Sequence, residues 1–323
     1  MTTTTTENIS FSVADAVKDG LSKKEKTLPS WLFYDAEGDR LFQKIMNMPE
    51  YYLTNCEYDI FQKYKNDLLN LITKETNKFS LIEFGAGDGL KTEILLKHFV
   101  ENDTNFSYKP VDISENVIQL LQNRMEKSIP DLDITPINKE YFSALDEFNE
   151  ARTNPCIVLF MGGNIGNFEM EDAQSFVNKI AAKLRTGDRF ILGFDLKKDP
   201  QMILDAYNDA GGITRQFNMN LLKRMNNELD ADFDSSAFKH FPTYDPQTGT
   251  TKSFLISQKK QEVNLNAIDT IISFDKWEPI HVEISQKFDS EMINEMATKA
   301  GLSVEKYFYD DQEYFTDVVM RKL

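Results

Sequence analysis

The sequence of 323 residues has little cysteine and little histidine, and it contains no long apolar run. Its two cysteines, Cys56 and Cys156, are too few for a disulfide framework, and its three histidines follow no spacing typical of metal ligands. We therefore expect a reducing compartment and no metal site. Residues 1–7 lack the basic and apolar regions of a targeting segment, and no stretch approaches the roughly 18 apolar residues that cross a bilayer. A soluble, cytoplasmic protein is expected.

Basic residues are also scarce. The chain has 36 lysines and arginines against 52 aspartates and glutamates, a net charge of -16. Such a charge repels phosphate groups, which argues against nucleic acids and anionic membranes as partners. With 41% hydrophobic residues the chain has enough apolar material for one large domain or two moderate ones. We expect a monomer that acts on a small molecule.

The clearest motif is a run of alternating glycines, Gly85, Gly87 and Gly89. An apolar stretch at 79–84 precedes it and a helical pattern at 91–97 follows it, so the pattern predicts a strand, a tight turn and a helix. Glycines allow backbone amides to approach a ligand closely. The alternative is a glycine-rich turn that binds nothing.

The glycine spacing favours one cofactor over another. A dinucleotide site uses G-x-G-x-x-G, whereas this run is Gly85-x-Gly87-x-Gly89. That form suits S-adenosylmethionine better than a nicotinamide dinucleotide, so an oxidoreductase is the disfavoured rival. Asp112 ends the next predicted strand, about 20 residues on, where a ribose diol would lie. Its alternative role is the N-cap of the following helix, for which Ser114 competes.

Two further loops follow predicted strands. Glu140 and Tyr141 come after a predicted strand at 132–137 and are candidates to flank an adenine ring, unless they form a solvated loop. A continuous apolar strand at 155–160 leads into a glycine-rich loop that contains Asn167. The amide of Asn167 offers a donor and an acceptor, which match the amine and carboxylate of an amino acid. Its alternative role is a helix N-cap.

Five βα units in series predict one doubly wound parallel sheet. From about residue 211 this rhythm breaks, and the pattern predicts a loop at 233–241. Strands are predicted at 252–258, 261–265, 270–274 and 277–285. Glu283 and Ser285 lie on one face of the last of these, either in a pocket or towards solvent. Two final strands are predicted to finish the edge of the main sheet.

Several blocks of the chain, taken together and in order, resemble the histidine-specific Nα-methyltransferases of ergothioneine biosynthesis, which use S-adenosylmethionine. The matching blocks are 33–36, 49–52, 83–92, 110–114, 163–168, 193–199, 217–218, 227–234 and 283–288. The resemblance implies an α/β fold: a doubly wound, Rossmann-like methyltransferase sheet with an inserted α+β substrate-binding domain. Residues 1–25 would form a tail and a first element, residues 26–198 and 286–323 the methyltransferase domain, and residues 199–285 the insertion.

The resemblance also implies site residues. Together with the loop glycines, the cofactor-binding set is Gly85, Gly87, Gly89, Lys91, Asp112, Glu140 and Tyr141. The substrate-binding set is Tyr51, Asn167, Tyr207, Glu283 and Ser285, and the residues expected at the reacting nitrogen are Tyr34, Tyr51 and Asn167. Asn167 and Tyr207 would hold the α-amino and α-carboxylate groups, and Glu283 and Ser285 the imidazole.

The implied reaction is methylation of the α-amino group of free L-histidine to trimethylhistidine (hercynine). Two positions depart from the family pattern: Gly163-Asn164 replaces Ser-Thr, and Ser253 stands where a methionine usually lines the side-chain pocket. The alternatives are the same chemistry on another aromatic amino acid, such as a tryptophan derivative, and a methyltransferase-like protein that binds without turnover. For transfer, the enzyme has mainly to align a neutral amine with the methyl group and exclude water.

Overall fold

The computed structural model describes residues 12–323, which form two compact units. The large unit comprises residues 52–198, 246–249 and 286–323. The small unit comprises the described residues up to 51, together with 199–245 and 250–285. Each unit has its own hydrophobic core.

The first boundary differs from the one expected from the sequence. Residues 26–51 were expected to join the methyltransferase domain, but they belong to the small unit. Strand β1 (Lys26–Thr27) pairs in parallel with β11 (Pro279–Gln286). Leu32 and Leu41 are buried in the same cluster as Leu221. These apolar side chains complete a core that the inserted segment alone would leave open.

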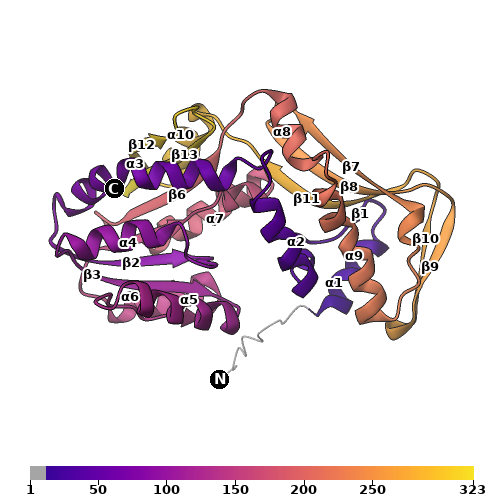
Figure 1. The fold of residues 1–323 in the computed structure, drawn as a ribbon, viewed down its shortest axis with the longest axis horizontal. Helices are drawn as coiled ribbons and strands as arrows, with labels where there is room; N and C mark the ends of the chain where they lie inside the picture. Colours follow the sequence, from indigo (N-terminus) through magenta and orange to yellow (C-terminus); the bar gives the residue numbers. More distant parts are fainter. Residues whose placement is uncertain (1–11) are drawn as a thin grey trace, which may run out of the picture. The chain divides into compact units, whose positions relative to one another are not determined.

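The large unit is built on a seven-stranded sheet with the order β12-β13-β6-β5-β2-β3-β4 (Figure 1). The strands are β2 (Lys78–Phe84), β3 (Asn105–Asp112), β4 (Ile137–Asn138), β5 (Cys156–Phe160), β6 (Arg189–Asp195), β12 (Leu302–Tyr309) and β13 (Phe315–Lys322). Strands β2 to β6 are parallel, and β13 runs antiparallel to both of its neighbours. The third predicted strand, at 132–137, is reduced to β4 and one bridge at Ile134.

Helices cover both faces of this sheet. They are α3 (Leu53–Thr73), α4 (Thr92–Glu101), α5 (Glu115–Ser128), α6 (Tyr141–Ala151), α7 (Met170–Lys183) and α10 (Ser290–Lys299). An apolar cluster joins one face to α6, α7 and α10. Helices α3 and α4 lie on the near side of the sheet in Figure 1. The predicted doubly wound α/β fold is confirmed.

Alternation along the strands assigns each side chain to a face. On β6, Phe190, Leu192 and Phe194 belong to the apolar cluster. The intervening Gly193 and Asp195 therefore point to the opposite face, towards α3. Because parallel strands end at one edge of the sheet, the glycine loop after β2, Asp112 at the end of β3 and the loop after β5 lie along the same edge.

The described residues of the small unit form two sheets, four α-helices and three short 3₁₀ helices. Its four-stranded sheet has the order β1-β11-β8-β7, and its two-stranded sheet pairs β9 with β10. The α-helices and the remaining strands are α1 (Val13–Ser22), α2 (Ala36–Met46), α8 (Pro200–Tyr207), α9 (Ile213–Leu229), β7 (Phe238–Asp245), β8 (Thr250–Ser257), β9 (Gln261–Leu265) and β10 (Thr270–Phe274). Strands β8, β9 and β10 agree with the predicted ones to within two residues.

The predicted loop at 233–241 is wrong in its second half, because β7 begins at Phe238. This strand contains Pro242, which argues against a central strand in the sequence. In the structure β7 lies at the edge of its sheet and pairs only with β8. A proline is tolerated there because an edge strand has one unpaired side.

The carboxylate of Asp195 contacts residues at the points where the chain enters and leaves the large unit. Tyr52, Lys198 and Lys287 stand at or next to the three main boundaries of that unit. The Tyr52 hydroxyl lies 3.0 Å from each oxygen of the Asp195 carboxylate, and Lys198 donates to Oδ1 at 2.5 Å. Lys287 lies 2.7 Å from Oδ2. One buried carboxylate therefore fixes three segments far apart in the sequence.

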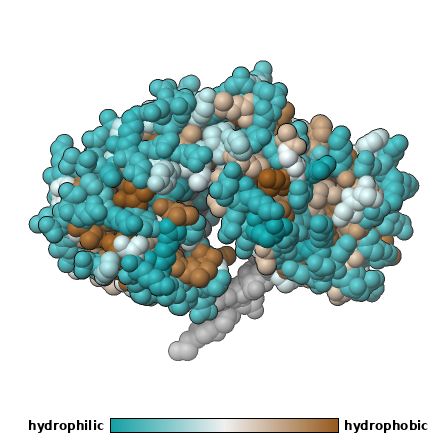
Figure 2. Space-filling view, in the orientation of Figure 1, coloured by the Kyte–Doolittle hydropathy of each residue, from teal (hydrophilic) through white to brown (hydrophobic). Residues whose placement is uncertain are grey.

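Among the helices of residues 12–323, none has the length and apolar character needed to cross a membrane. Most of the surface seen in Figure 2 is hydrophilic, with apolar residues scattered over it. This surface agrees with a chain in which 27% of the residues are charged.

Candidate functional site

The glycine loop has the conformation that its sequence predicts. Gly85, Gly87 and Gly89 have φ angles of 65°, 55° and 67°, in the left-handed region that favours glycine. A Cβ atom at Gly89 would lie 2.3 Å from Leu121 and 2.5 Å from Met125, so this glycine allows α5 to pack closely. A Cβ atom at Gly87 would approach only the Gly85 carbonyl oxygen, at 4.0 Å. The backbone at Gly87 is thus open to a ligand.

Tyr141 lies directly beside this loop. A Cβ atom at Gly85 would lie 2.9 Å from the Tyr141 hydroxyl. The Tyr141 ring stacks on Phe84 with a centroid separation of 4.8 Å. Burial, with the negative charges of Asp112 and Glu140, raises the pKa of Tyr141 to about 12. Its hydroxyl therefore stays protonated at neutral pH and can donate a hydrogen bond.

Asp112 is the last residue of β3, and it does not cap the next helix. Ser114 is the N-cap of α5 and accepts the Val117 amide at 3.4 Å. Asp112 Oδ1 accepts the Ser114 amide at 2.9 Å. Burial raises the pKa of Asp112, and the amides of Ser114 and Ile113 oppose that effect. A half-buried carboxylate at this edge of the sheet suits a pair of hydroxyl donors.

Glu140 has a structural role that the sequence did not reveal. It is the N-cap of α6, and its Oε2 accepts the amides of Phe142 and Ser143 at 3.0 Å each. Glu140 is exposed, whereas the neighbouring Tyr141 is half-buried. Of the two candidates at this strand end, Tyr141 therefore has the closer relation to the glycine loop.

Lys91 stands at the N-terminus of α4 and forms an ion pair with Glu57. Glu57 is fully buried, and its Oε1 accepts the Gly162 amide at 2.6 Å. Burial lowers the pKa of Lys91, but Glu57 outweighs it, so the pKa lies above its usual value. Sequence reasoning missed Glu57. The available signal was a glutamate on the apolar stripe of α3, three and four residues before Ile60 and Phe61.

Asn167 ends the short 3₁₀ helix η2 (Asn164–Asn167), which follows β5. It is exposed and does not cap α7, because the N-cap of that helix is Glu169. Its side-chain amide makes no hydrogen bond within the part of the chain that the structure describes. The donor and acceptor of this amide therefore remain available to a ligand.

In the small unit, Glu283 and Tyr207 each lie within electrostatic range of the Tyr34 hydroxyl. Tyr34 exposes 47% of its surface, but its hydroxyl is in a crowded environment. Burial, the charges of Glu283 and Asp39, and the nearby Tyr207 raise the pKa of the Tyr34 hydroxyl well above its ordinary value. Tyr34 is therefore a neutral phenol across the physiological range.

Glu283 and Ser253 are joined across neighbouring strands β11 and β8. Ser253 is fully buried, and its hydroxyl donates to Glu283 Oε2 at 2.8 Å. Ser285 follows two residues later on β11 and is 8% exposed. The buried Ser253 hydroxyl thus holds the Glu283 carboxylate in place.

Aromatic rings surround Tyr34. Its ring meets Phe42 edge-on at 5.8 Å and Phe217 at 6.1 Å between centroids. Phe42 also meets Tyr51 edge-on at 6.4 Å. Tyr34 and Tyr51 are thus linked through one phenylalanine. The small unit brings together hydroxyls, a carboxylate and aromatic faces, which suit an aromatic amino acid.

The groups in the large unit fit S-adenosylmethionine. The open backbone at Gly87 would allow the close approach that the ligand needs, and the carboxylate of Asp112 could accept hydrogen bonds from ribose hydroxyls. Lys91 carries a positive charge that could attract the carboxylate of its amino-acid part, although that charge is shared with Glu57. The ligand has no phosphate group, which agrees with the absence of the dinucleotide spacing.

Comparison with known proteins gives a consistent result. The family model described as "Histidine-specific methyltransferase, SAM-dependent" matches residues 13–322. Histidine N-alpha-methyltransferase from Mycobacterium tuberculosis is 30% identical over 91% of this chain and 90% of its own length. Ergothioneine biosynthesis protein 1 from Schizosaccharomyces pombe is 28% identical over 93% of this chain but 40% of its own length. An L-tryptophan methyltransferase from Psilocybe serbica is 26% identical over 95% of this chain and 92% of its own length.

Proposed function

Because the chain belongs to the family of S-adenosylmethionine-dependent, histidine-specific methyltransferases, we propose that its substrate is free L-histidine, methylated on the α-amino nitrogen. That it is an N-methyltransferase dependent on S-adenosylmethionine follows from the family itself. The proposal concerns the substrate, the number of methyl groups and the residues that carry out the reaction.

The cofactor is assigned to the large unit. Bound S-adenosylmethionine supplies a methyl group on a sulfonium sulfur, which is an electrophile without further activation. The glycine loop would hold its amino-acid part through backbone amides, with Lys91 at the carboxylate. Asp112 would accept hydrogen bonds from the ribose, and Tyr141 and Glu140 would flank the adenine.

The substrate roles are assigned by residue type. Asn167 and Tyr207 would bind the α-amino and α-carboxylate groups, because an amide and a phenol can each donate and accept. Glu283 would accept a hydrogen bond from an imidazole N–H, with Ser285 at the second ring nitrogen. Tyr51 would complete the site as an aromatic wall.

The substrate amine must lose a proton before each transfer. The raised pKa of Tyr34 disfavours a phenolate, so this residue would orient the amine as a neutral hydroxyl and leave the proton to water. As methyl groups accumulate, the nitrogen loses its donors and gains a fixed positive charge. The rings of Tyr34 and Tyr51 can then stabilise the cation, which supports trimethylhistidine (hercynine) as the product.

The observation that carries histidine as the substrate is the Ser253–Glu283 contact of 2.8 Å. It holds a carboxylate on β11 near the Tyr34 hydroxyl, where a ring N–H donor needs an acceptor. The same contact is also compatible with a second candidate substrate. Ser253 is smaller than the methionine that the family usually has, so a larger ring such as that of a tryptophan derivative is the alternative substrate.

A methyl-transfer assay with histidine and tryptophan, on the wild type and on Glu283→Gln, tests the proposal. Loss of a charged hydrogen bond should raise the KM for histidine by roughly 10- to 100-fold, while the KM for S-adenosylmethionine changes by less than about twofold. Glu262→Gln, on β9 of the same unit, is the matched control and should leave both constants unchanged.

Two outcomes would overturn the assignment. Unchanged histidine kinetics in Glu283→Gln would remove the proposed imidazole contact. A higher kcat/KM for tryptophan than for histidine in the wild type would make the alternative substrate the better one. Mass spectrometry of the product after exhaustive reaction would count the methyl groups.

A further inference from the structure

A second carboxyl group is buried next to the Glu57–Lys91 ion pair. Asp317 lies on β13 and is 2% exposed. Neither of its carboxyl oxygens receives a hydrogen bond from an N–H or O–H donor of residues 12–323. The acceptor that faces it is the Glu57 carboxylate. Two carboxyl groups in this arrangement are stable only if they share a proton.

The backbone at Gly162 and Gly193 leaves room for the Glu57 carboxylate. Its Oε1 accepts the Gly162 amide at 2.6 Å, from the loop after β5. A Cβ atom at Gly193 would lie 2.6 Å from the same oxygen, so only a glycine fits on β6 at this point. Gly193 is the register partner of Asp317. Helix α3 and strands β5, β6 and β13 thus converge on one carboxylate.

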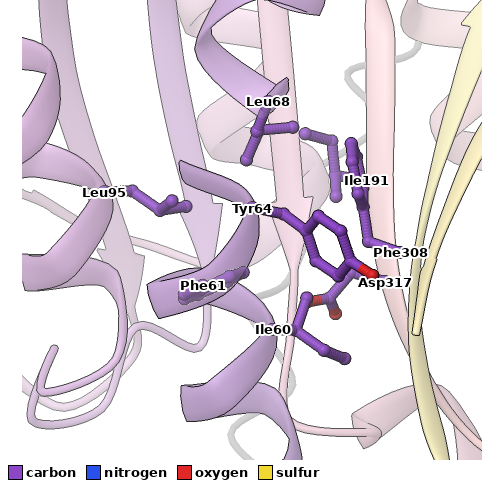
Figure 3. A pocket seen from close by; sticks show the side chains of 8 residues that line it. All are labelled: Ile60, Phe61, Tyr64, Leu68, Leu95, Ile191, Phe308 and Asp317. Atoms are coloured by element: carbon purple, nitrogen blue, oxygen red, sulfur yellow. The ribbon is translucent and has the colours of Figure 1, made fainter. Parts of the chain in front are cut away.

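Among the described residues, none of those that line the cavity beside Asp317 is a cation. This cavity has a volume of about 10 Å³, room for no more than one water molecule. Figure 3 shows the carboxyl group among Ile60, Tyr64 and Phe308. The lining residues are Ile60, Phe61, Tyr64, Leu68, Leu95, Ile191, Phe308 and Asp317. Burial and the charge of Glu57 raise the pKa of Asp317 well above its usual value, and Lys91 only partly opposes them.

We propose that a protonated Asp317 donates to the Glu57 carboxylate and thereby sets how strongly Lys91 can hold the carboxylate of the bound cofactor. Both are positioning residues, because they act through Lys91 and the Gly162 amide. The proton of Asp317 withdraws negative charge from Glu57, so that Lys91 is only partly neutralised and can also attract a ligand carboxylate. This inference rests on the proposed contact between Lys91 and the cofactor.

The protonation state can be tested through stability. Asp317→Asn keeps a neutral donor to Glu57 and removes the need to take up a proton on folding. The melting temperature of this variant should equal or exceed that of the wild type at pH 8. The advantage should grow with pH between 5 and 8, by up to roughly 3–5 °C for each pH unit.

Asp188 provides the matched control. It is 2% exposed in the same unit, but it forms a two-point ion pair with Arg152, at 2.8 and 2.5 Å. Asp188→Asn should therefore lower the melting temperature by roughly 10 °C. A comparable loss in Asp317→Asn would show that Asp317 is ionised and would overturn the proposal. Infrared difference spectra give an independent measurement: a protonated carboxyl band should be present in the wild type and absent from Asp317→Asn.

The effect on the cofactor can be tested with two ligands. S-adenosylhomocysteine carries the amino-acid part, whereas 5′-methylthioadenosine lacks it. Asp317→Leu removes the proton donor, so S-adenosylhomocysteine should bind roughly 3- to 10-fold more weakly by calorimetry, with 5′-methylthioadenosine unchanged. Asp317→Asn should restore the affinity. Equal losses for both ligands, or no loss, would overturn the coupling.

Lys91→Met separates this inference from the proposed function. It should weaken S-adenosylhomocysteine and leave 5′-methylthioadenosine unchanged. If Lys91→Met affects neither ligand, the assignment of Lys91 to the cofactor fails, and the coupling fails with it. The infrared and stability measurements on Asp317 would still decide whether the carboxyl pair exists.

Discussion

The two faces of the seven-stranded sheet differ in what they bury. The face towards α6, α7 and α10, here called the apolar face, presents side chains such as Leu192 and Val318. The face towards α3, here called the ionic face, presents Glu83, Asp195 and Asp317 from the alternate positions of β2, β6 and β13. The same sheet therefore packs against an apolar core on one face and carries buried charged groups on the other.

This difference between the two faces indicates that they have different roles in the large unit. Burying a charge costs free energy that pairing seldom recovers in full, so buried ions are poor sources of stability. The apolar face can supply the stability of the unit through burial alone. The ionic face instead connects Lys91, the Gly162 loop and the boundary residues Lys198 and Lys287, which all lie near the edge that carries the candidate cofactor site.

The largest effect should come from placing a charge on the wrong face. Val318→Asp adds a carboxyl group to the apolar cluster, one residue from Asp317, where none of the cluster residues is a cation. The large unit should lose more than about 4 kcal/mol of its free energy of unfolding. Urea denaturation followed by circular dichroism would measure the loss.

Val318→Ala is the control, because it removes volume without adding charge. It should cost about 1–3 kcal/mol, and the cost should not depend on pH. If Val318→Asp were tolerated as well as Val318→Ala, the distinction between the two faces would have no energetic basis.

A smaller loss is expected from Asp195→Asn on the ionic face. Burial would raise the pKa of Asp195, but Lys287 and Lys198 outweigh it and hold the pKa below its usual value. The substitution removes the carboxylate that pairs with two buried ammonium groups, which should cost about 3–5 kcal/mol. Asp289→Asn is the control, since Asp289 pairs with Lys197 near the surface and should cost at most about 1 kcal/mol. Equal losses in the two variants would contradict the proposal that the Asp195 carboxylate holds its three segments together.

The sequence predicted the part of this architecture that depends on local patterns. The glycine triplet specified its own left-handed backbone, and Ser114 was recognisable as a competitor for the helix cap. The apolar runs specified β5 and β6 because both faces of these strands are buried. Each of these signals lies within a few residues of the feature that it predicts.

What the sequence did not predict depends on contacts between distant segments. Residues 26–51 join the small unit because their apolar side chains meet α9, about 180 residues later in the chain. The ion pair of Glu57 and Lys91 joins residues 34 positions apart. The N-cap role of Glu140 is a local feature that was not predicted, because an N-cap and a ligand contact use the same residue types. The site assignments themselves stay predictions until they are measured.

The smallest expected effect is a change in the pH dependence of stability that comes from one carboxyl group on the ionic face. Glu83 is 3% exposed, and burial raises its pKa to about 7 despite hydrogen bonds from Thr92 and Tyr108. A carboxyl group with a raised folded-state pKa stabilises the fold below its unfolded pKa and loses that contribution as pH rises. Wild-type stability should therefore fall by up to about 3 kcal/mol between pH 4.5 and 7 from this group alone. Glu83→Gln should remove that part of the slope in urea titrations at several pH values.

Glu93 gives the opposite sign and serves as the control for Glu83. It pairs with Lys97 and Arg124, and although burial opposes them, the net pKa of Glu93 is lowered. Its contribution is present above the unfolded pKa and is lost only as pH falls, so Glu93→Gln should leave the slope between pH 5 and 7 as in the wild type. If Glu83→Gln and Glu93→Gln changed the pH dependence of stability equally, that dependence could not be attributed to the buried Glu83. Carboxyl groups on the ionic face would then titrate like exposed ones.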